Sequence, residues 1–125
     1  MEQIVMSRLS EEERNIFDNA IYFPMLLTIL DRDFKVAETA PFKLNQVYLN
    51  LIEHTMKKVQ KDMRENKTKM YKNKWKLVKG ENDGVFTEYN FYFNGYHEVH
   101  RYFNANLKNT TEKLLNYYFL HRDSD

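Results

Sequence analysis

The chain has 125 residues, 42% of them hydrophobic and 30% charged, so we expect a single globular domain, residues 1–125, and not a disordered or fibrous chain. It contains no cysteine, which excludes disulfide scaffolds, thiolate metal sites and cysteine nucleophiles and fits a reducing cytoplasm. The formal net charge is only +1, but residues 54–79 carry ten Lys and Arg against Asp62 and Glu65, so this segment holds +8 and the rest −7.

Two short helices are predicted in the N-terminal third. Ser10 and Glu13 have the spacing of a capping box, in which each side chain bonds the backbone N–H of the other residue, so a helix begins here. Pro24 interrupts the pattern and fits the first turn of a second helix, where a missing N–H costs nothing. Apolar residues then recur at helical spacing as far as Phe34.

The third predicted helix is the most periodic element and runs from about Phe42 to about Glu65. Its apolar residues recur three and four positions apart, which is the spacing of one helical face. They are Leu44, Val47, Tyr48, Leu51, Ile52, Thr55, Met56, Val59 and Met63. The opposite face becomes basic toward the C-terminal end of this helix.

A β-hairpin is predicted next. In Lys69–Lys79 alternate residues are aromatic or apolar on one face and mostly lysine on the other, as in a strand. Gly80–Gly84 has the composition of a turn, and Val85–Phe93 alternates again. A five-residue loop brings the apolar faces together, and it pairs Trp75 with Tyr89 and Lys76 with Glu88.

After this hairpin the pattern favours helix. Asn94 and Gly95 end the second strand, and Asn94 is suited to cap a helix. Tyr96, Val99, His100, Phe103 and Leu107 follow at helical spacing. The polar residues near Asn109 weaken the pattern, so we expect either one long helix or two short ones.

The predicted fold is therefore α+β and mostly α. It has three N-terminal helices, a two-stranded antiparallel β-hairpin and one long or two short C-terminal helices. Winged-helix domains have a similar order of elements, although the third helix is longer than a usual recognition helix. This likeness concerns the fold alone and does not predict function.

The basic segment predicts a surface for phosphates, because lysines at a helix end and on a strand face could converge. The candidate nucleic-acid-binding residues are Lys57, Lys61, Arg64, Lys67, Lys69, Lys72, Lys74 and Lys76. Two other interpretations stay open. The lysines could form a solvated face that protects an edge strand, or they could bind an acidic protein.

Aromatic residues are concentrated near the predicted hairpin and the last helix. Such side chains, when exposed, often mark protein interfaces. The candidate interface residues are Phe86, Tyr92, Tyr102 and Tyr117. A helix that covers this face is an equally simple interpretation.

The sequence contains no recognisable catalytic or cofactor motif. His97, Glu98 and His100 form His-Glu-x-His, and not the His-Glu-x-x-His of zinc proteases, and no further ligands are evident. We therefore predict no metal, no cofactor and no enzymatic activity. There is also no predicted secretion signal, and the longest apolar run, Ile21–Leu30, is shorter than the roughly 20 residues that a membrane span needs.

The main hypothesis from the sequence is a small cytoplasmic regulatory or accessory protein that binds nucleic acid. The frequent Lys, Asn and Tyr are typical of an AT-rich bacterium or its phage. The alternative is a protein–protein adaptor that forms a homodimer through the aromatic hairpin and the last helix.

Overall fold

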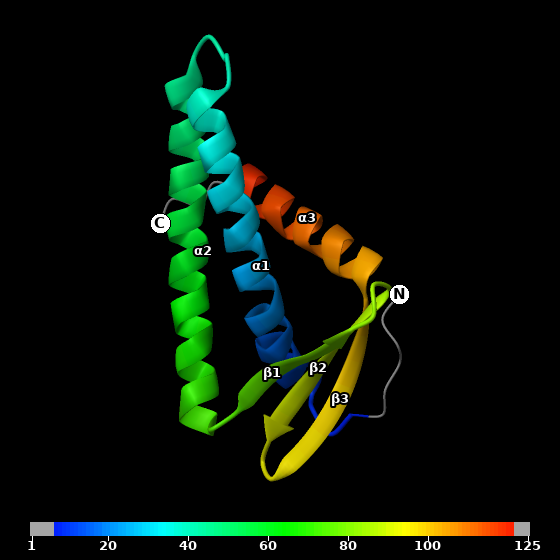
Figure 1. Ribbon diagram of the computed structural model, residues 1–125. Coiled ribbons are helices and arrows are strands. Elements are labelled where there is room, and N and C mark those ends of the chain that lie inside the picture. Colours follow the sequence, from blue (N-terminus) through cyan, green and yellow to red (C-terminus); the bar gives the residue numbers. More distant parts are fainter. Residues whose placement is uncertain (1–6, 122–125) are drawn as a thin grey trace.

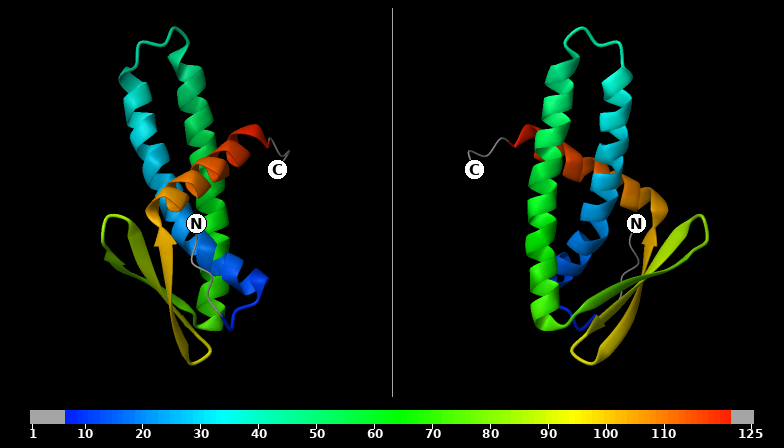
Figure 2. Two further views of the ribbon diagram at one scale, coloured as in Figure 1. Left: turned by 90° about the vertical axis from the view of Figure 1, so that its right-hand side faces the viewer. Right: turned by 60° about the vertical axis from the view of Figure 1, so that its left-hand side comes forward.

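The fold is described from a computed structural model, in which residues 7–121 are defined. Over this range the chain forms three helices and one antiparallel sheet, with strand order β1-β2-β3 (Figure 1). The elements are α1 (Glu11–Thr39), α2 (Asn45–Asn73), β1 (Lys76–Asn82), β2 (Phe86–Phe93), β3 (Tyr96–Phe103) and α3 (Asn104–Leu120). The long helices α1 and α2 lie side by side, the sheet packs at one end of them, and α3 crosses their middle (Figure 2).

The α+β class is confirmed, but the predicted arrangement is wrong. Two helices precede the sheet where three were expected, the sheet has three strands where two were expected, and one helix closes the described chain. This arrangement also rules out the likeness to winged-helix domains. Each error can be traced to particular residues.

α1 is one helix because burial on both sides of Pro24 holds it together. The capping box at its start is confirmed: the Ser10 hydroxyl accepts from the Glu13 N–H, and the Glu13 carboxylate accepts from the Ser10 N–H. Pro24 itself is exposed, whereas Phe23 and Leu26 are buried beside it. A proline inside a helix costs about 3 kcal/mol, and burying two large side chains offsets a cost of that size.

α2 continues past the predicted end at Glu65 and takes in residues that were expected to form a strand. Asn66 and Met70 lie four positions apart and are both buried, and the Asn66 amide donates to the backbone carbonyl of Ile16 at 2.9 Å. The helix ends at Lys74, which adopts a left-handed conformation with φ of 59°. The alternation of lysines and aromatics in this stretch therefore does not reflect a strand.

β3 replaces the start of the predicted C-terminal helix. Asn94 and Gly95 have φ of 51° and 81°, so they form a two-residue hairpin turn with a positive φ at both positions. The apolar residues of Tyr96–Phe103 fit the spacing of a helix as well as that of a strand. In the structure, His100 and Tyr102 are buried and alternate with more exposed neighbours, as a strand requires. α3 then runs without a break through Asn109.

The register of β1 and β2 also differs from the prediction, although the faces are right. Lys76 lies opposite Tyr92 and not Glu88, a shift of four residues, and Trp75 precedes the strand. An even shift leaves every side chain on its predicted face. The inner face of β2 is accordingly buried, at Thr87, Tyr89, Phe91 and Phe93.

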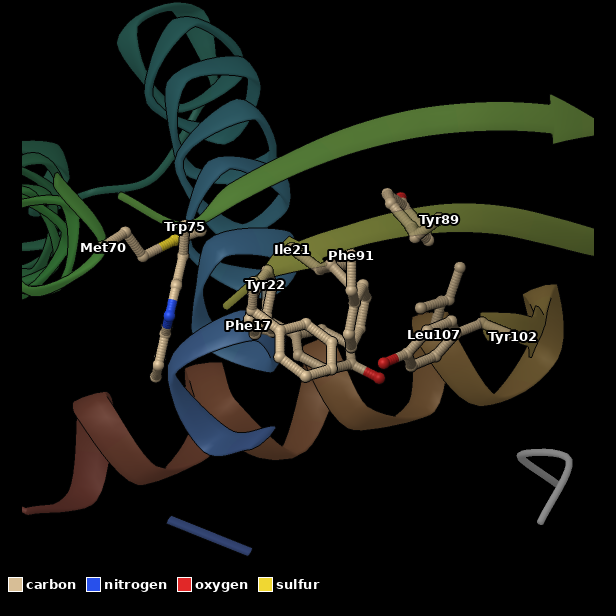
Figure 3. Close-up of a cluster of buried hydrophobic side chains, with 10 residues drawn as sticks. Phe17, Ile21, Tyr22, Met70, Trp75, Tyr89, Phe91, Tyr102 and Leu107 are labelled. Atoms are coloured by element: carbon tan, nitrogen blue, oxygen red, sulfur yellow. The ribbon is translucent and has the colours of Figure 1, made fainter. Parts of the chain in front are cut away.

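Two clusters of apolar side chains form the core. In the first, Phe17 stacks between Trp75 and Phe91, with ring centroids 5.4 and 4.5 Å away (Figure 3). This cluster joins the first turns of α1 to the inner face of the sheet. The second cluster lies between α1, α2 and α3 and centres on Phe23, Leu26, Leu30 and Val59.

Candidate nucleic-acid interface

The predicted basic residues belong mainly to one helix. Six of them are on α2, Lys74 is the residue that ends this helix, and Lys76 is the first residue of β1. All eight are exposed: Lys57, Lys61, Arg64, Lys67, Lys69, Lys72, Lys74 and Lys76. The expected contribution of a lysine-rich strand face is therefore largely absent, because most of that stretch is helical.

Lys57, Lys61 and Arg64 share one face of α2, because they are four and then three residues apart. That face is opposite the side on which Thr55 and Val59 are buried. The remaining cations are distributed around the last turns and the end of the helix. We call the eight residues together the basic ridge.

The cations of the basic ridge form no close ion pair with a carboxylate in the described range. Among residues 7–121, none of the observed ion pairs involves a member of the ridge. Asp62, one of the two acids in the segment, accepts a short hydrogen bond from the Tyr118 hydroxyl of α3. Its carboxylate is therefore directed toward α3, and the cations remain available to an external anion.

The position of the ridge also suits the electrostatics of the helix. Cations near a helix C-terminus interact favourably with the negative end of its dipole. Lys72 lies in the last turn of α2 and Lys74 follows it directly. The local fold thus tolerates dense positive charge at this end.

Tyr71 is the aromatic residue best placed within the ridge. It is 84% exposed and lies seven residues after Arg64, on the same face of α2. Trp75, by contrast, is only 8% exposed, and its indole N–H donates to the Asn94 side chain. Of the two aromatics that adjoin the lysines, only Tyr71 can stack on a ligand.

His97 does not converge with Glu98 and His100, which contact each other. They lie on β3, where His97 points to the outer face and stacks on Tyr92, while Glu98 and His100 point inward. Within the described range, no group of three or more His, Cys, Asp or Glu residues could hold a metal ion. The strand conformation separates the two imidazoles that helical spacing would have aligned.

A polar network around Glu98 was not anticipated from the sequence. Its carboxylate accepts from the Ser7 hydroxyl at 2.7 Å and from the Arg8 N–H at 3.0 Å, and it contacts His100 Nε2 at 2.9 Å. Burial by itself raises the pKa of Glu98, but these three partners together hold it below its ordinary value. The network attaches the residues before α1 to the sheet. Because its partners are about 90 positions apart in the sequence, no local sequence pattern indicates it.

The predicted aromatic interface does not form one surface. Phe86 and Tyr92 lie on the outer face of β2, as expected, and Tyr117 is exposed on α3. Tyr102 points inward, is fully buried and donates its hydroxyl to Asp18 at 2.6 Å, so it cannot contact a partner. The outer sheet face and α3 are on different sides of the molecule (Figure 2).

The comparisons with known proteins identify a family. The sequence profile of a family described as YhjD protein matches residues 8–123. A protein of Bacillus subtilis (strain 168), named "Uncharacterized protein YhjD", is 36% identical over 118 residues, which is 94% of this chain and 98% of that protein. No solved structure matches the chain. No helix in the described range is long and apolar enough to cross a membrane.

Proposed function

The chain belongs to the YhjD protein family, and we propose that it is a non-enzymatic cytoplasmic accessory protein of bacteria that binds nucleic acid through the basic ridge of α2. The observation that carries this proposal is a set of eight exposed cations on and beside one helix, without carboxylate partners in the described structure. The similarity to a bacterial protein supports the bacterial origin.

An exposed helix is a suitable carrier for phosphate contacts. Lys57, Lys61 and Arg64 follow one face over two turns, so they can contact successive phosphates while the helix lies along a groove or a backbone. Each contact releases condensed counterions, which makes binding strongly salt-dependent. Tyr71 adds one exposed ring on the same face, which could stack on an unpaired base.

The direct test uses fluorescence anisotropy to measure binding of labelled DNA duplex, single-stranded DNA and RNA at several salt concentrations. We expect binding at about 50 mM salt that weakens steeply by about 200 mM. A triple variant, Lys57→Glu, Lys61→Glu and Arg64→Glu, should lower affinity at least tenfold, because three favourable charges become repulsive.

A matched control reverses the same number of charges elsewhere. Lys43, Lys108 and Lys113 are exposed and lie outside the basic ridge. Their triple change to Glu alters the net charge by the same amount, so it separates a local effect from a general one. Equal loss of binding in both triple variants, or no detectable binding at about 50 mM salt, would contradict the proposal.

The second candidate is the homodimeric protein–protein adaptor. The observation that favours it is exposed apolar surface, including Tyr92 at 38% and Val99 at 43% on the outer face of the sheet. Size-exclusion chromatography with light scattering, combined with the nucleic-acid binding assay, discriminates between the two functions. A stable dimer that does not bind nucleic acid, and that Tyr92→Ser with Val99→Ser dissociates, favours the adaptor.

A further inference from the structure

The inner face of α2 remains apolar beyond the point where α3 covers it. Ile52 packs in the second core cluster with side chains of α3, such as Leu115. Tyr48 lies one turn before Ile52 on the same face and is 48% exposed, and Leu44, the N-cap residue of α2, is 67% exposed. The apolar residues that the sequence predicts to be buried on α2 are therefore exposed near the loop between α1 and α2.

This end of the helix pair projects away from the rest of the protein. We call residues 31–50 the helical arm; it comprises the end of α1, the connecting loop and the start of α2. In all three ribbon views, neither α3 nor the sheet lies beside its tip (Figures 1 and 2). Within the arm, Ala37 is buried between the helices, but the larger apolar side chains are not.

The exposed apolar area of the arm is large. Five side chains are between 48% and 67% exposed: Val36, Phe42, Leu44, Val47 and Tyr48. Together they present roughly 500 Å² to solvent, given the size of aromatic and aliphatic side chains. The five residues lie within Val36–Tyr48 at one end of the helix pair, and exposed apolar area of this size on small proteins commonly serves association. Two copies that cover these side chains would bury about 1,000 Å² from these residues alone, near the lower limit for a specific interface.

The outer face of the sheet is a weaker candidate for association because its side chains already contact one another. Phe86 packs against Phe103 and lies under the guanidinium of Arg101, while Tyr92 stacks on His97. In the arm, the ring contact between Phe42 and Tyr48 still leaves both residues about half exposed. A partner therefore gains more burial at the arm.

The charges of the arm favour a second copy of the same chain as the occupant. Three acids and three bases alternate along its sequence, so its net charge is zero: Asp31, Asp33, Glu38, Arg32, Lys35 and Lys43. A neutral surface with both signs does not repel an identical one, and it offers no positive field to an anionic membrane. The two basic ridges, which do repel each other, lie toward the other end of α2.

We infer that two copies of the chain associate through their helical arms, with Val36, Leu44, Val47 and Tyr48 of each copy at an isologous interface. Two helical hairpins that meet in this way form a short four-helix bundle, which is a common solution for covering apolar helix faces. This inference does not depend on nucleic-acid binding, and either can fail while the other holds.

The mass in solution tests the dimer. We expect light scattering to give twice the chain mass at about 100 µM protein. The double variant Leu44→Ser and Val47→Ser should raise the dissociation constant at least tenfold, because it removes apolar area at exposed positions. The control pair Tyr92→Ser and Val99→Ser, on the outer sheet face, should leave the mass unchanged. Unaltered circular dichroism and Trp75 emission would establish that both variants fold.

The absence of native cysteine allows a second test by geometry. A single Val47→Cys substitution should allow a flexible bismaleimide to cross-link two copies, whereas Tyr92→Cys should not. A wild-type monomer at about 100 µM, or a dimer that the sheet variant dissociates and the arm variant does not, overturns the inference. So does a monomeric chain that floats with neutral phosphatidylcholine vesicles through the same residues, because a lipid surface then occupies the arm.

Discussion

Phe17 of α1 and Phe91 of β2 stack face to face, with ring centroids 4.5 Å apart and 6° between the ring planes. Both side chains are fully buried, and Phe17 also stacks on Trp75. This contact joins the helix pair to the sheet.

Replacing Phe17 with Ala should therefore lower the free energy of unfolding by about 3–5 kcal/mol, the range for a fully buried phenylalanine. Urea unfolding followed by Trp75 emission measures it. Tyr71→Ala, at an 84% exposed aromatic, is the control and should change stability by no more than about 0.5 kcal/mol. Similar losses in both variants would show that the stacked rings contribute little.

The network around Glu98 predicts a pH dependence of stability. The folded pKa of this carboxyl lies below its ordinary value of 4.5. A group with a depressed folded pKa contributes stability above its unfolded pKa, and that contribution is lost as pH falls from there through the folded pKa. Thermal unfolding should therefore show a decrease below about pH 4.5 that is smaller in Glu98→Gln.

Glu88→Gln is the matched control for that experiment, because Glu88 lies on the outer face of the same sheet. Its pH profile should follow that of the wild type. An acid-side slope that is the same in wild type and in Glu98→Gln would mean that other carboxyls account for the transition.

Lys74 has two roles, because it ends α2 and belongs to the basic ridge. It ends α2 with φ of 59°, a conformation that glycine adopts without strain. We expect Lys74→Gly to raise the free energy of unfolding by about 1 kcal/mol. If Lys74 contacts a phosphate, the same change should reduce the salt dependence of nucleic-acid binding by about one unit of slope.

Lys72→Gly provides the contrast. It removes the same charge, but from the last turn inside the helix, where glycine costs about 1 kcal/mol relative to a good helix former. Chemical denaturation of the two variants should thus give opposite signs. A loss of stability in both would show that the backbone at residue 74 is not strained.

Tyr118 attaches α3 to α2 through its hydrogen bond to Asp62. Burial, and secondarily the bond to this carboxylate, raise the pKa of the Tyr118 hydroxyl well above its ordinary value. Tyr118→Phe should cost about 1–3 kcal/mol, because it leaves the carboxylate without this donor. Urea unfolding measures the free energy of unfolding. Tyr117→Phe, at a half-exposed neighbour, should leave that free energy nearly unchanged.

The sequence was most informative where a local signal has no competitor. The capping box at Ser10 and Glu13 depends on residues three positions apart, and the structure confirms it. The inward face of β2 was correct as well, because alternation over eight residues matches only a strand. Both signals act within one element and need no knowledge of its neighbours.

The errors arise where tertiary packing decides between two local options. Pro24 is a strong interruption signal, but the buried side chains beside it keep α1 continuous. Asn94 and Gly95 are a strong hairpin signal, which the helical spacing of Tyr96 and Val99 outweighed in the sequence interpretation. The composition of the sequence indicates the cations of the ridge. It does not indicate that most of them lie on one helix, because the helix extends past Glu65 through the burial of Asn66 and Met70.

The continuity of α2 relates the two surfaces proposed above. From Asn45 at the arm to Arg64 on the ridge the helix rises roughly 30 Å, at 1.5 Å per residue. If the arms overlap over Asn45–Asn50 in an antiparallel four-helix bundle, the two Arg64 residues lie roughly 50 Å apart, beyond the roughly 34 Å between half-sites on one face of a duplex. Such an assembly is suited to bridging two separate strands or duplexes, and it predicts compaction of long DNA where a lone protomer would merely coat it.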